Sequence, residues 1–209
     1  MKNIMLVGIQ WSGKWTQGRK ILEKYPDDFV IFDMGSELRK FAVSGSPDGD
    51  HVRSFLEQWI KAPTEYIIKF SEKFIKENGN KRIIIDWAIR SKEQNDAMES
   101  VWWDFDVFWF DLSEETTVKR LCGRRIDPIT QETFPASFTG NTNPKTGNTL
   151  VVRADDTEEA IRKRIAWSIG DTLPLIDTWK RHGHAVYPID ADQSEEEIFE
   201  EVEKCFLRK

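Results

Sequence analysis

The stretch over residues 3–17 limits the possible folds more than any other part of the chain. An apolar run, Asn3–Val7, leads into the sequence GIQWSGKWTQ and then into a segment with helical spacing. Gly8, Gly13 and Lys14 fit the spacing G-x-x-x-x-G-K, in the strand, loop and helix context that makes this pattern meaningful. Backbone N–H groups of such a loop and the helix N-terminus bind phosphate, and the lysine adds a positive charge. The stretch therefore predicts a phosphate-binding loop, with an ordinary strand-to-helix turn as the alternative.

Short apolar runs alternate with longer amphipathic segments along the chain, which is typical of a parallel sheet covered by helices. The α/β class follows from this alternation. Each apolar run ends in or just before a Gly or Asp, where a buried parallel strand gives way to a loop. The predicted strands are Asn3–Val7, Phe29–Asp33, Arg82–Asp86, Phe105–Asp111 and Ala185–Asp190. Helical spacing or capping residues predict helices over Lys14–Lys24, Glu37–Val43, Val52–Trp59, Thr64–Glu77, Lys92–Val101, Glu114–Arg124, Thr157–His182 and Ser194–Leu207.

Composition narrows the class of protein. A chain of 209 residues is sized for one domain, and its net charge of −6 argues against nucleic acid as the main partner. Cys122 and Cys205 are too few for a disulfide framework or a four-ligand zinc site, so they predict a reducing compartment. No apolar run reaches the roughly 18 residues of a membrane helix, and the N-terminus lacks the features of a signal peptide. We expect a cytoplasmic protein without a membrane partner.

Charged residues flank one long irregular segment. Residues Ile126–Val152 are rich in Pro, Gly, Asn and Thr, and an insertion of this kind is most often a lid or a binding loop. Arginines lie at both of its ends, in the sequences GRR and RADDTEEAIRKR, where they would close over a polyphosphate and stabilise negative charge. Arg125 and Arg162 are interpreted as solvated residues. Asp86 ends the apolar run RIIID, which favours a role in orienting Mg2+ or its waters, or else a cap on the next helix.

Together these residues resemble the motifs of the adenylate kinases, in the family's order and over nearly the whole chain. The family's phosphate loop, G-x-P-G-S-G-K-G-T-Q, matches Gly8–Gln17. Its monophosphate-binding element, T-G-D-M-L-R, matches Met34–Arg39. Its remaining elements, D-G-F-P-R-T...Q, G-R-R and R-x-D-D-x-x-E...R-x-R, match Asp86–Ser91 with Gln94, Gly123–Arg125, and Arg153–Arg164.

The resemblance implies a P-loop kinase core with a five-stranded parallel sheet, helices on both faces and two mobile inserts in a single domain. The core would comprise residues 1–33, 63–125 and 153–209. Residues 34–62 would bind the nucleoside monophosphate, and residues 126–152 would form the lid. The implied reaction is reversible phosphoryl transfer from ATP to AMP, giving two ADP, by a monomeric enzyme that uses Mg2+ with ATP.

The resemblance also implies the roles of individual residues. Lys14, Arg90, Arg124, Arg153 and Arg164 would be catalytic, because positioning and positive charge do most of the work in phosphoryl transfer. Asp86 would reach Mg2+ through water, and no zinc site is expected. The implied ATP-binding residues are Gly8, Trp11, Ser12, Gly13, Lys14, Trp15, Thr16, Arg120, Arg124, Thr133, Phe134 and Gln193. The implied AMP-binding residues are Met34, Gly35, Arg39, Ile60, Lys61, Ala62, Trp87, Arg90, Gln94, Arg153 and Arg164.

Some positions depart from the family's motifs. Met34 replaces a threonine, Ser36 an acid and Ile89 a proline, so the sequence leaves open a kinase for another nucleoside monophosphate. The lid has no cysteine, so it would be held by hydrogen bonds and by packing of residues such as Phe134 and Phe138. A nucleotide-binding protein without catalysis is the alternative of a different class.

Trp11, Trp15, Trp59 and Trp87 stand where the family has glycine. A Cβ in the left-handed region costs about 1–2 kcal/mol, and an indole competes for the volume of the phosphate. Three explanations are open: loss of activity, a site repacked around aromatic residues, or UGA codons read as glycine in the source organism. The third is favoured, because the basic residues of the motifs are intact and the sequence shows no compensation for the indoles. UGG codons at these positions would exclude it.

Overall fold

The structure is a computed structural model that describes residues 2–58, 60–86, 89, 91–99, 101, 104–130, 132–152 and 157–207, without the side chain of Arg164. None of the helices in these ranges is both long and apolar enough to cross a membrane. The elements follow in the order β1 (Asn3–Gly8), α1 (Lys14–Lys24), β2 (Phe29–Asp33), α2 (Met34–Ala42), α3 (Pro47–Glu57), α4 (Thr64–Asn78), β3 (Arg82–Asp86), α5 (Lys92–Met98), β4 (Phe105–Asp111), α6 (Glu114–Leu121), β5 (Arg125–Ile126), β6 (Thr133–Phe134), β7 (Val151–Val152), α7 (Glu158–Trp167), the π-helix η1 (Ser168–Thr172), α8 (Leu175–Arg181), β8 (Val186–Asp190) and α9 (Glu195–Leu207).

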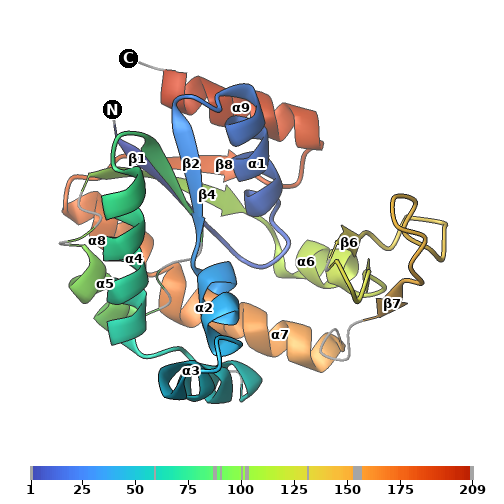
Figure 1. The fold of residues 1–209 in the computed structure, drawn as a ribbon. Coiled ribbons are helices and arrows are strands. Elements are labelled where there is room, and N and C mark those ends of the chain that lie inside the picture. The colour runs from blue at the N-terminus through green and yellow to red at the C-terminus, as the bar shows by residue number, and fades with distance from the viewer. Residues whose placement is uncertain are drawn as a thin grey trace.

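The larger sheet is parallel and has helices on both faces (Figure 1). Within the described residues it has five strands in the order β2-β3-β1-β4-β8. Side chains alternate between the two faces of a strand. Thus Ile83 and Ile85 of β3 join one buried cluster, which includes residues of α2 to α5 and α8, while Ile84 joins the other, with residues of α1 and α9. Burial on both faces explains the continuous apolar runs of the sequence.

The parallel five-stranded sheet confirms the α/β P-loop class that the sequence predicts. The single long helix predicted over Thr157–His182 is wrong. Helix α7 ends at Trp167, a π-helix follows, and α8 begins after Pro174. Proline has no N–H to donate and its ring clashes with the preceding turn, so a regular helix cannot continue through it.

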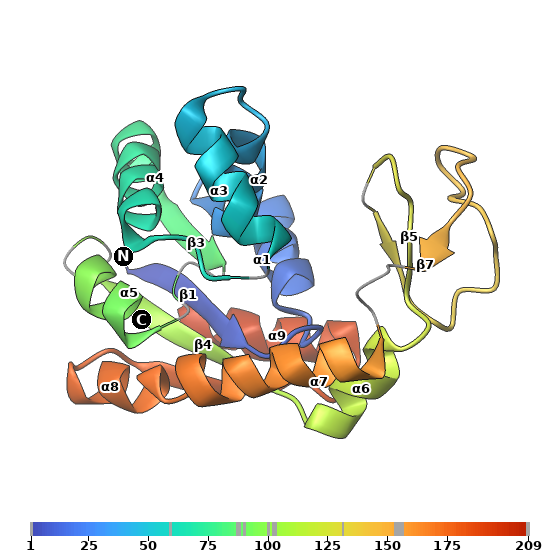
Figure 2. The same cartoon turned by 90° about the horizontal axis from the view of Figure 1, so that it is seen from below.

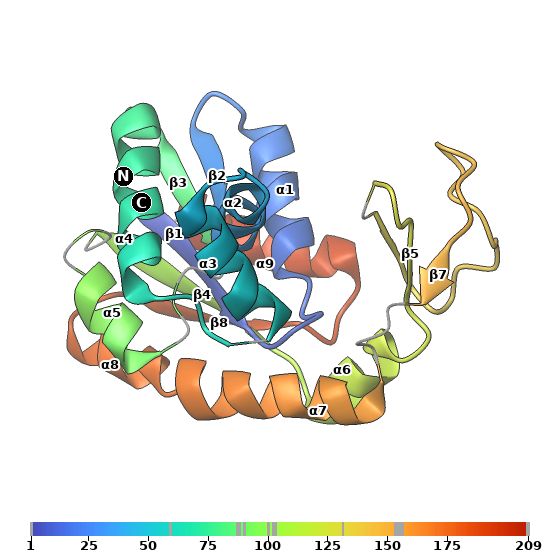
Figure 3. The same cartoon turned by 60° about the horizontal axis from the view of Figure 1, so that its bottom comes forward.

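Two segments extend from the sheet. The helical segment, Met34–Glu57, comprises α2 and α3 and lies against α4 (Figure 1). The small-sheet segment, residues 125–152, contains the three-stranded antiparallel sheet β6-β5-β7 and projects from the end of α6 and α7 (Figures 2 and 3). Its Phe134 and Phe138 rings lie 4.9 Å apart between centroids, which confirms the packing expected for them.

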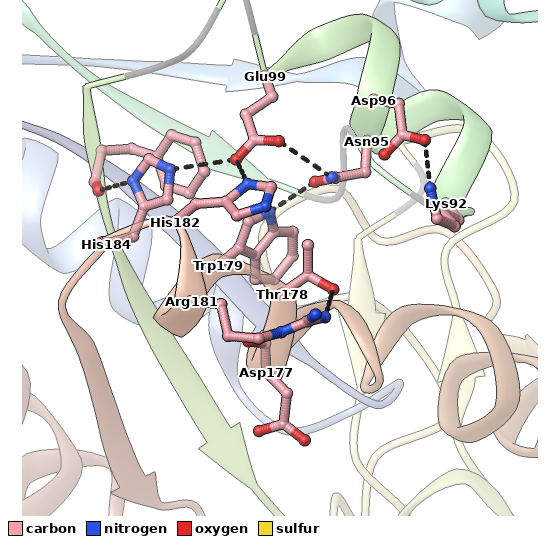
Figure 4. Close-up of polar contacts among 11 residues, drawn as sticks. Lys92, Asn95, Asp96, Glu99, Asp177, Thr178, Trp179, Arg181, His182 and His184 are labelled. Atoms are coloured by element: carbon pink, nitrogen blue, oxygen red, sulfur yellow. Dashed lines mark hydrogen bonds and ion pairs between the residues drawn. The ribbon is translucent and has the colours of Figure 1, made fainter.

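A polar cluster ties α5 to the end of α8 and to β4 at the amino ends of the strands (Figure 4). Glu99, the C-cap residue of α5, pairs with His182 and lies 3.6 Å from Nε2 of His184. Nδ1 of His184 in turn donates to the backbone oxygen of Phe105, the first residue of β4, at 2.9 Å. Because this end of the sheet is opposite to the β1–α1 turn, the cluster fixes the scaffold rather than the candidate site.

Candidate active site

The turn between β1 and α1 has the backbone of a phosphate-binding loop. A Cβ on Gly8 would lie 2.6 Å from the backbone oxygen of Phe110 in the neighbouring strand, so only glycine allows this approach. Gly13 is left-handed, with φ 83, and is the N-cap residue of α1. The N-terminus of α1 therefore points its N–H groups and its positive dipole end at the loop, an arrangement that binds anions.

Lys14 folds back over this loop. Its Nζ lies 2.8 Å from the backbone oxygens of Gly8 and Ile9 and 3.3 Å from Oγ of Ser12. Ser12 is buried, and Thr16 lies in the first turn of α1. The structure therefore brings together the loop residues that the motif predicts, with the ammonium group of Lys14 at their centre.

The two tryptophans of the loop have different environments. Trp11 has φ 62, and it is the one residue other than glycine with a positive φ among those the structure describes. A left-handed conformation costs about 1–2 kcal/mol, so the backbone at this position favours glycine. Trp15 lies in the first turn of α1 with 43% of its surface exposed, and nothing in the helix geometry requires glycine there.

Predicted ATP-binding residues from two distant parts of the chain meet at α6 and the β8–α9 loop. Nη1 of Arg120 donates to the backbone oxygen of Ala191 at 3.1 Å, and Nη2 lies 3.2 Å from Oδ1 of Asp192. Gln193 is the next residue and donates to the backbone oxygen of Asp190 at 3.3 Å. These contacts place Arg120 and Gln193 on one surface.

Arg124 lies close to the phosphate-binding loop, whereas the predicted lid residues do not. Arg124 is 8% exposed, and its guanidinium carbon lies 5.1 Å from the ring centroid of Trp11. Thr133 and Phe134 form β6, and the small sheet projects away from the β1–α1 turn (Figures 2 and 3). The structure therefore brings Arg124 to the loop but not Thr133 and Phe134.

The predicted AMP-binding residues Gly35 and Arg39 lie in α2, just after the carboxyl end of β2. Asp33 and Asp86, the last residues of β2 and β3, are partners in the sheet register. Asp33 caps α2 by accepting from the backbone N–H of Ser36 at 3.1 Å. Nη2 of Arg39 lies 3.1 Å from Oγ of Ser36 and 3.7 Å from Oδ2 of Asp33. A Cβ on Gly35 would lie 3.0 Å from Nη1 of Arg39, so the guanidinium packs directly over this glycine.

The other predicted AMP-binding residues are less uniform in exposure. Gln94 is buried and donates to the backbone oxygen of Ala62 at 3.1 Å. Nζ of Lys61 lies 2.7 Å from Oδ2 of Asp171, a residue of η1, while Ile60 is half exposed. The side chain of Met34 is 2% exposed and belongs to the main core, so it is packed among apolar residues rather than presented at a surface.

Several predicted site residues lie outside the described residues. These are Trp87, Arg90 and Arg153, together with the side chain of Arg164 and with Trp59. Their roles stay predictions from the motifs.

One buried residue of the small-sheet segment, Asp127, was not predicted from the sequence. Its carboxylate is fully buried and accepts hydrogen bonds from the side chains of Asn143, Thr146 and Asn148. Burial opposes its ionisation, but the backbone N–H groups of Ile129 and Thr130 and these amides hold the pKa of Asp127 well below its usual range. The sequences DPIT and NPKT are turn signals, but a turn signal does not show that the two turns meet in the fold.

Arg125 makes separate contacts within the small-sheet segment. Its guanidinium donates to the backbone oxygen of Gly140 at 2.8 Å and to the backbone oxygen of Phe138. The interpretation of Arg125 as a solvated residue is therefore wrong, because residues 138–140 of the small-sheet segment fold back onto its side chain. Arg162 is exposed and pairs with Glu158 and Glu114, as expected for a solvated residue.

Asp86 is the residue that fits a magnesium ion bound together with a nucleotide. Asp86 is the last residue of β3 and is the register partner of Leu6 in β1. Leu6 lies two residues before the loop begins at Gly8. The Oδ1 atom of Asp86 is buried. Carboxylate oxygens suit Mg2+ or the waters around it. The described residues contain no group of three or more His, Cys, Asp or Glu side chains that could hold a metal by themselves.

Comparison with known proteins agrees with this arrangement. A family model described as an AAA domain matches residues 7–135. The chain is 29% identical to an adenylate kinase of Hydrogenobaculum sp. over 95% of this chain and 97% of the relative. It is 29% identical to an adenylate kinase of Chloroherpeton thalassium, covering 96% of both chains. It is 32% identical to UMP-CMP kinase 3 of Arabidopsis thaliana, over 97% of this chain and 88% of the relative.

Proposed function

The chain belongs to the adenylate kinase family of P-loop nucleoside monophosphate kinases, and we propose that it transfers a phosphoryl group reversibly from ATP to AMP, giving two ADP. The single observation that carries the proposal is the meeting of donor and acceptor motifs at one edge of the sheet. The phosphate loop follows β1, Asp86 ends the neighbouring β3, and Asp33 with Arg39 follows β2. Two phosphate-binding motifs at one edge of the sheet, after β1 and after β2 with β3 between them, suit transfer between two nucleotides.

In this proposal each motif residue has the task that the family's motifs imply. Lys14 and Arg124 hold the ATP phosphates, and Arg120 with Gln193 lies at the adenine. Thr133 and Phe134 join them when the lid closes. Arg39 and Arg90 hold the AMP phosphate, Gln94 reads the base, and the remaining AMP-binding motif residues line the pocket. No general base is required, because charge and positioning dominate phosphoryl transfer.

Magnesium enters as part of the ATP substrate and supplies charge neutralisation on the phosphates. Asp86 would hold this ion through water. Arg153 and Arg164 swing in from the lid hinge to neutralise the transferring group. The enzyme acts as a cytoplasmic monomer, and its substrates ATP, AMP and ADP are its partners.

A second candidate is a kinase for another nucleoside monophosphate. It is supported by the 32% identity to UMP-CMP kinase 3, which exceeds the 29% identity to the two adenylate kinases described above. It is also supported by Met34, whose side chain is buried in the core at a position where the adenylate kinase motif has a threonine. A third candidate is nucleotide binding without turnover, in which the tryptophans at the family's glycine positions prevent phosphoryl transfer.

The experiment is a coupled assay of the purified chain with MgATP and with AMP, GMP, CMP and UMP as acceptors. We expect AMP to give the highest kcat/KM. A preference for CMP or UMP would replace the proposal by the second candidate. Binding of ATP in calorimetry without turnover of any acceptor would support the third.

A further inference from the structure

The phosphate loop is joined to the lid hinge through the indole of Trp11. Besides the left-handed backbone described above, the ring packs against a buried apolar cluster formed by Val118 and Leu121 of α6 and Ile161 and Ile165 of α7. These helices lie side by side at the base of the small-sheet segment (Figures 2 and 3). A strained backbone persists only where its surroundings hold it, and this packing supplies such a hold.

The same ring faces a positive charge. The guanidinium carbon of Arg124 lies 5.1 Å from the ring centroid of Trp11, and Arg124 is 8% exposed. A cation over an indole is attracted by the ring's negative face, and the attraction grows when water is excluded. Arg124 lies in the short connection between α6 and β5, so its position is the hinge between the core and the small-sheet segment.

We infer that Trp11 is a positioning residue, which holds Arg124 beside the phosphate loop before ATP binds. This inference rests on the proposed function, in which Arg124 holds the ATP phosphates. A glycine at position 11 offers neither the ring face nor the apolar contact with α6 and α7. The indole thus supplies, at this one position, the compensation for the family glycine that the sequence did not reveal.

The required property is a ring face, so the test compares replacements that keep or remove it. Trp11→Leu keeps apolar contact with the cluster but has no π face, and Trp11→Phe keeps a smaller one. Trp11→Gly restores the family's residue. Trp167→Leu is the matched control, because Trp167 is an exposed residue of α7 whose ring lies 5.8 Å from Nζ of Lys163.

We expect Trp11→Leu and Trp11→Gly to lower kcat/KM for MgATP by about tenfold, while KM for the acceptor changes little. Trp11→Phe should keep most of the parent's kcat/KM for MgATP, and Trp167→Leu should have the same kcat/KM as the parent chain. A Trp11→Gly variant as active as the parent, or more active, overturns the inference and favours glycine as the residue encoded at this position.

A second measurement does not depend on activity. In NMR spectra of the ligand-free protein, the Nε–H proton of Arg124, assigned with Arg124→Lys, should be shifted upfield by the ring current. The shift should disappear in Trp11→Leu and persist in Trp11→Phe. Its absence from the parent overturns the inference, whereas its presence in a chain without kinase turnover supports the contact and refutes only the proposed function.

Discussion

The helical segment and the small-sheet segment extend from the same scaffold but are held by different forces. The helical segment contributes Met34, Leu38, Ala42 and Val52 to the main apolar core. The small-sheet segment has buried polar residues at its centre, Asp127 and Asn143, and both are fully inaccessible. One segment is therefore an extension of the core, and the other is organised around a carboxylate of its own.

This difference predicts whether each segment unfolds with the whole domain or locally. Removing the helical segment from the sheet would expose part of the main core, so it should unfold together with the whole domain. The small-sheet segment carries its own hydrogen-bond network and projects from the hinge after α6 (Figure 3). It should open or unfold locally without loss of the remaining fold.

The largest expected difference in stability is between two Leu→Ala variants, one in each segment. Leu38→Ala removes a 4% exposed side chain from the main core, and we expect the global free energy of unfolding to fall by about 3 kcal/mol. Leu150→Ala, at a 7% exposed position of the small-sheet segment, should leave the global denaturant midpoint nearly unchanged. Equal shifts of the two midpoints in urea would show that the segments are not held differently.

Asp127→Asn tests the network of the small-sheet segment. The new amide group would face donors from Asn143, Thr146 and Asn148, so buried donors would lose their acceptor. Amide hydrogen exchange in residues 125–152 should accelerate roughly ten- to a hundredfold, while exchange in the large sheet stays unchanged. Lys145→Met is the control, because it breaks only the exposed pair with Glu132 and should change little. Acceleration spread evenly over both sheets would contradict a local network.

Acid should destabilise the small-sheet segment before the helical segment. The pKa of Asp127 is lower in the folded chain than in the unfolded chain, because its hydrogen bonds outweigh the effect of burial. Its stabilisation is therefore complete above the unfolded pKa of about 3.9 and is lost as pH falls through the lower folded pKa. Amide exchange measured between pH 5 and pH 2 should show protection lost first in the small-sheet segment. Earlier loss of protection in α2 and α3 would refute this order.

The smallest effect concerns the cap of α3 in the helical segment. Oγ of Ser46 accepts from the backbone N–H of Gly49 at 3.0 Å. Ser46→Ala should lower the global free energy of unfolding by about 1 kcal/mol, measured by chemical denaturation. Ser54→Ala, inside the same helix, removes a hydroxyl that donates to the backbone oxygen of His51 and should be nearly neutral. If Ser46→Ala changes only local exchange in α3, the helical segment is less tied to the core than its packing indicates.

Most of the fold was predictable because its signals are local. The runs Phe29–Asp33 and Arg82–Asp86 form strands with the predicted bounds, since continuous apolar sequence and a terminal Asp mark a buried parallel strand. The helix predicted over Thr157–His182 is divided by the π-helix that follows Trp167, and α8 begins only after Pro174, which has no N–H to donate. Asp127 was missed, because its importance comes from partners up to Asn148 that meet it only in three dimensions.

The sequence by itself determined the phosphate loop, since Gly8, Gly13 and Lys14 act through backbone geometry and a charge within one turn of chain. It also determined the family, through motifs in a fixed order. Only the tertiary structure decided what surrounds Trp11, because its partners in α6 and α7 and the guanidinium of Arg124 come from distant parts of the chain. The energy of a strained backbone depends on these non-local contacts, and no local pattern in the sequence encodes them.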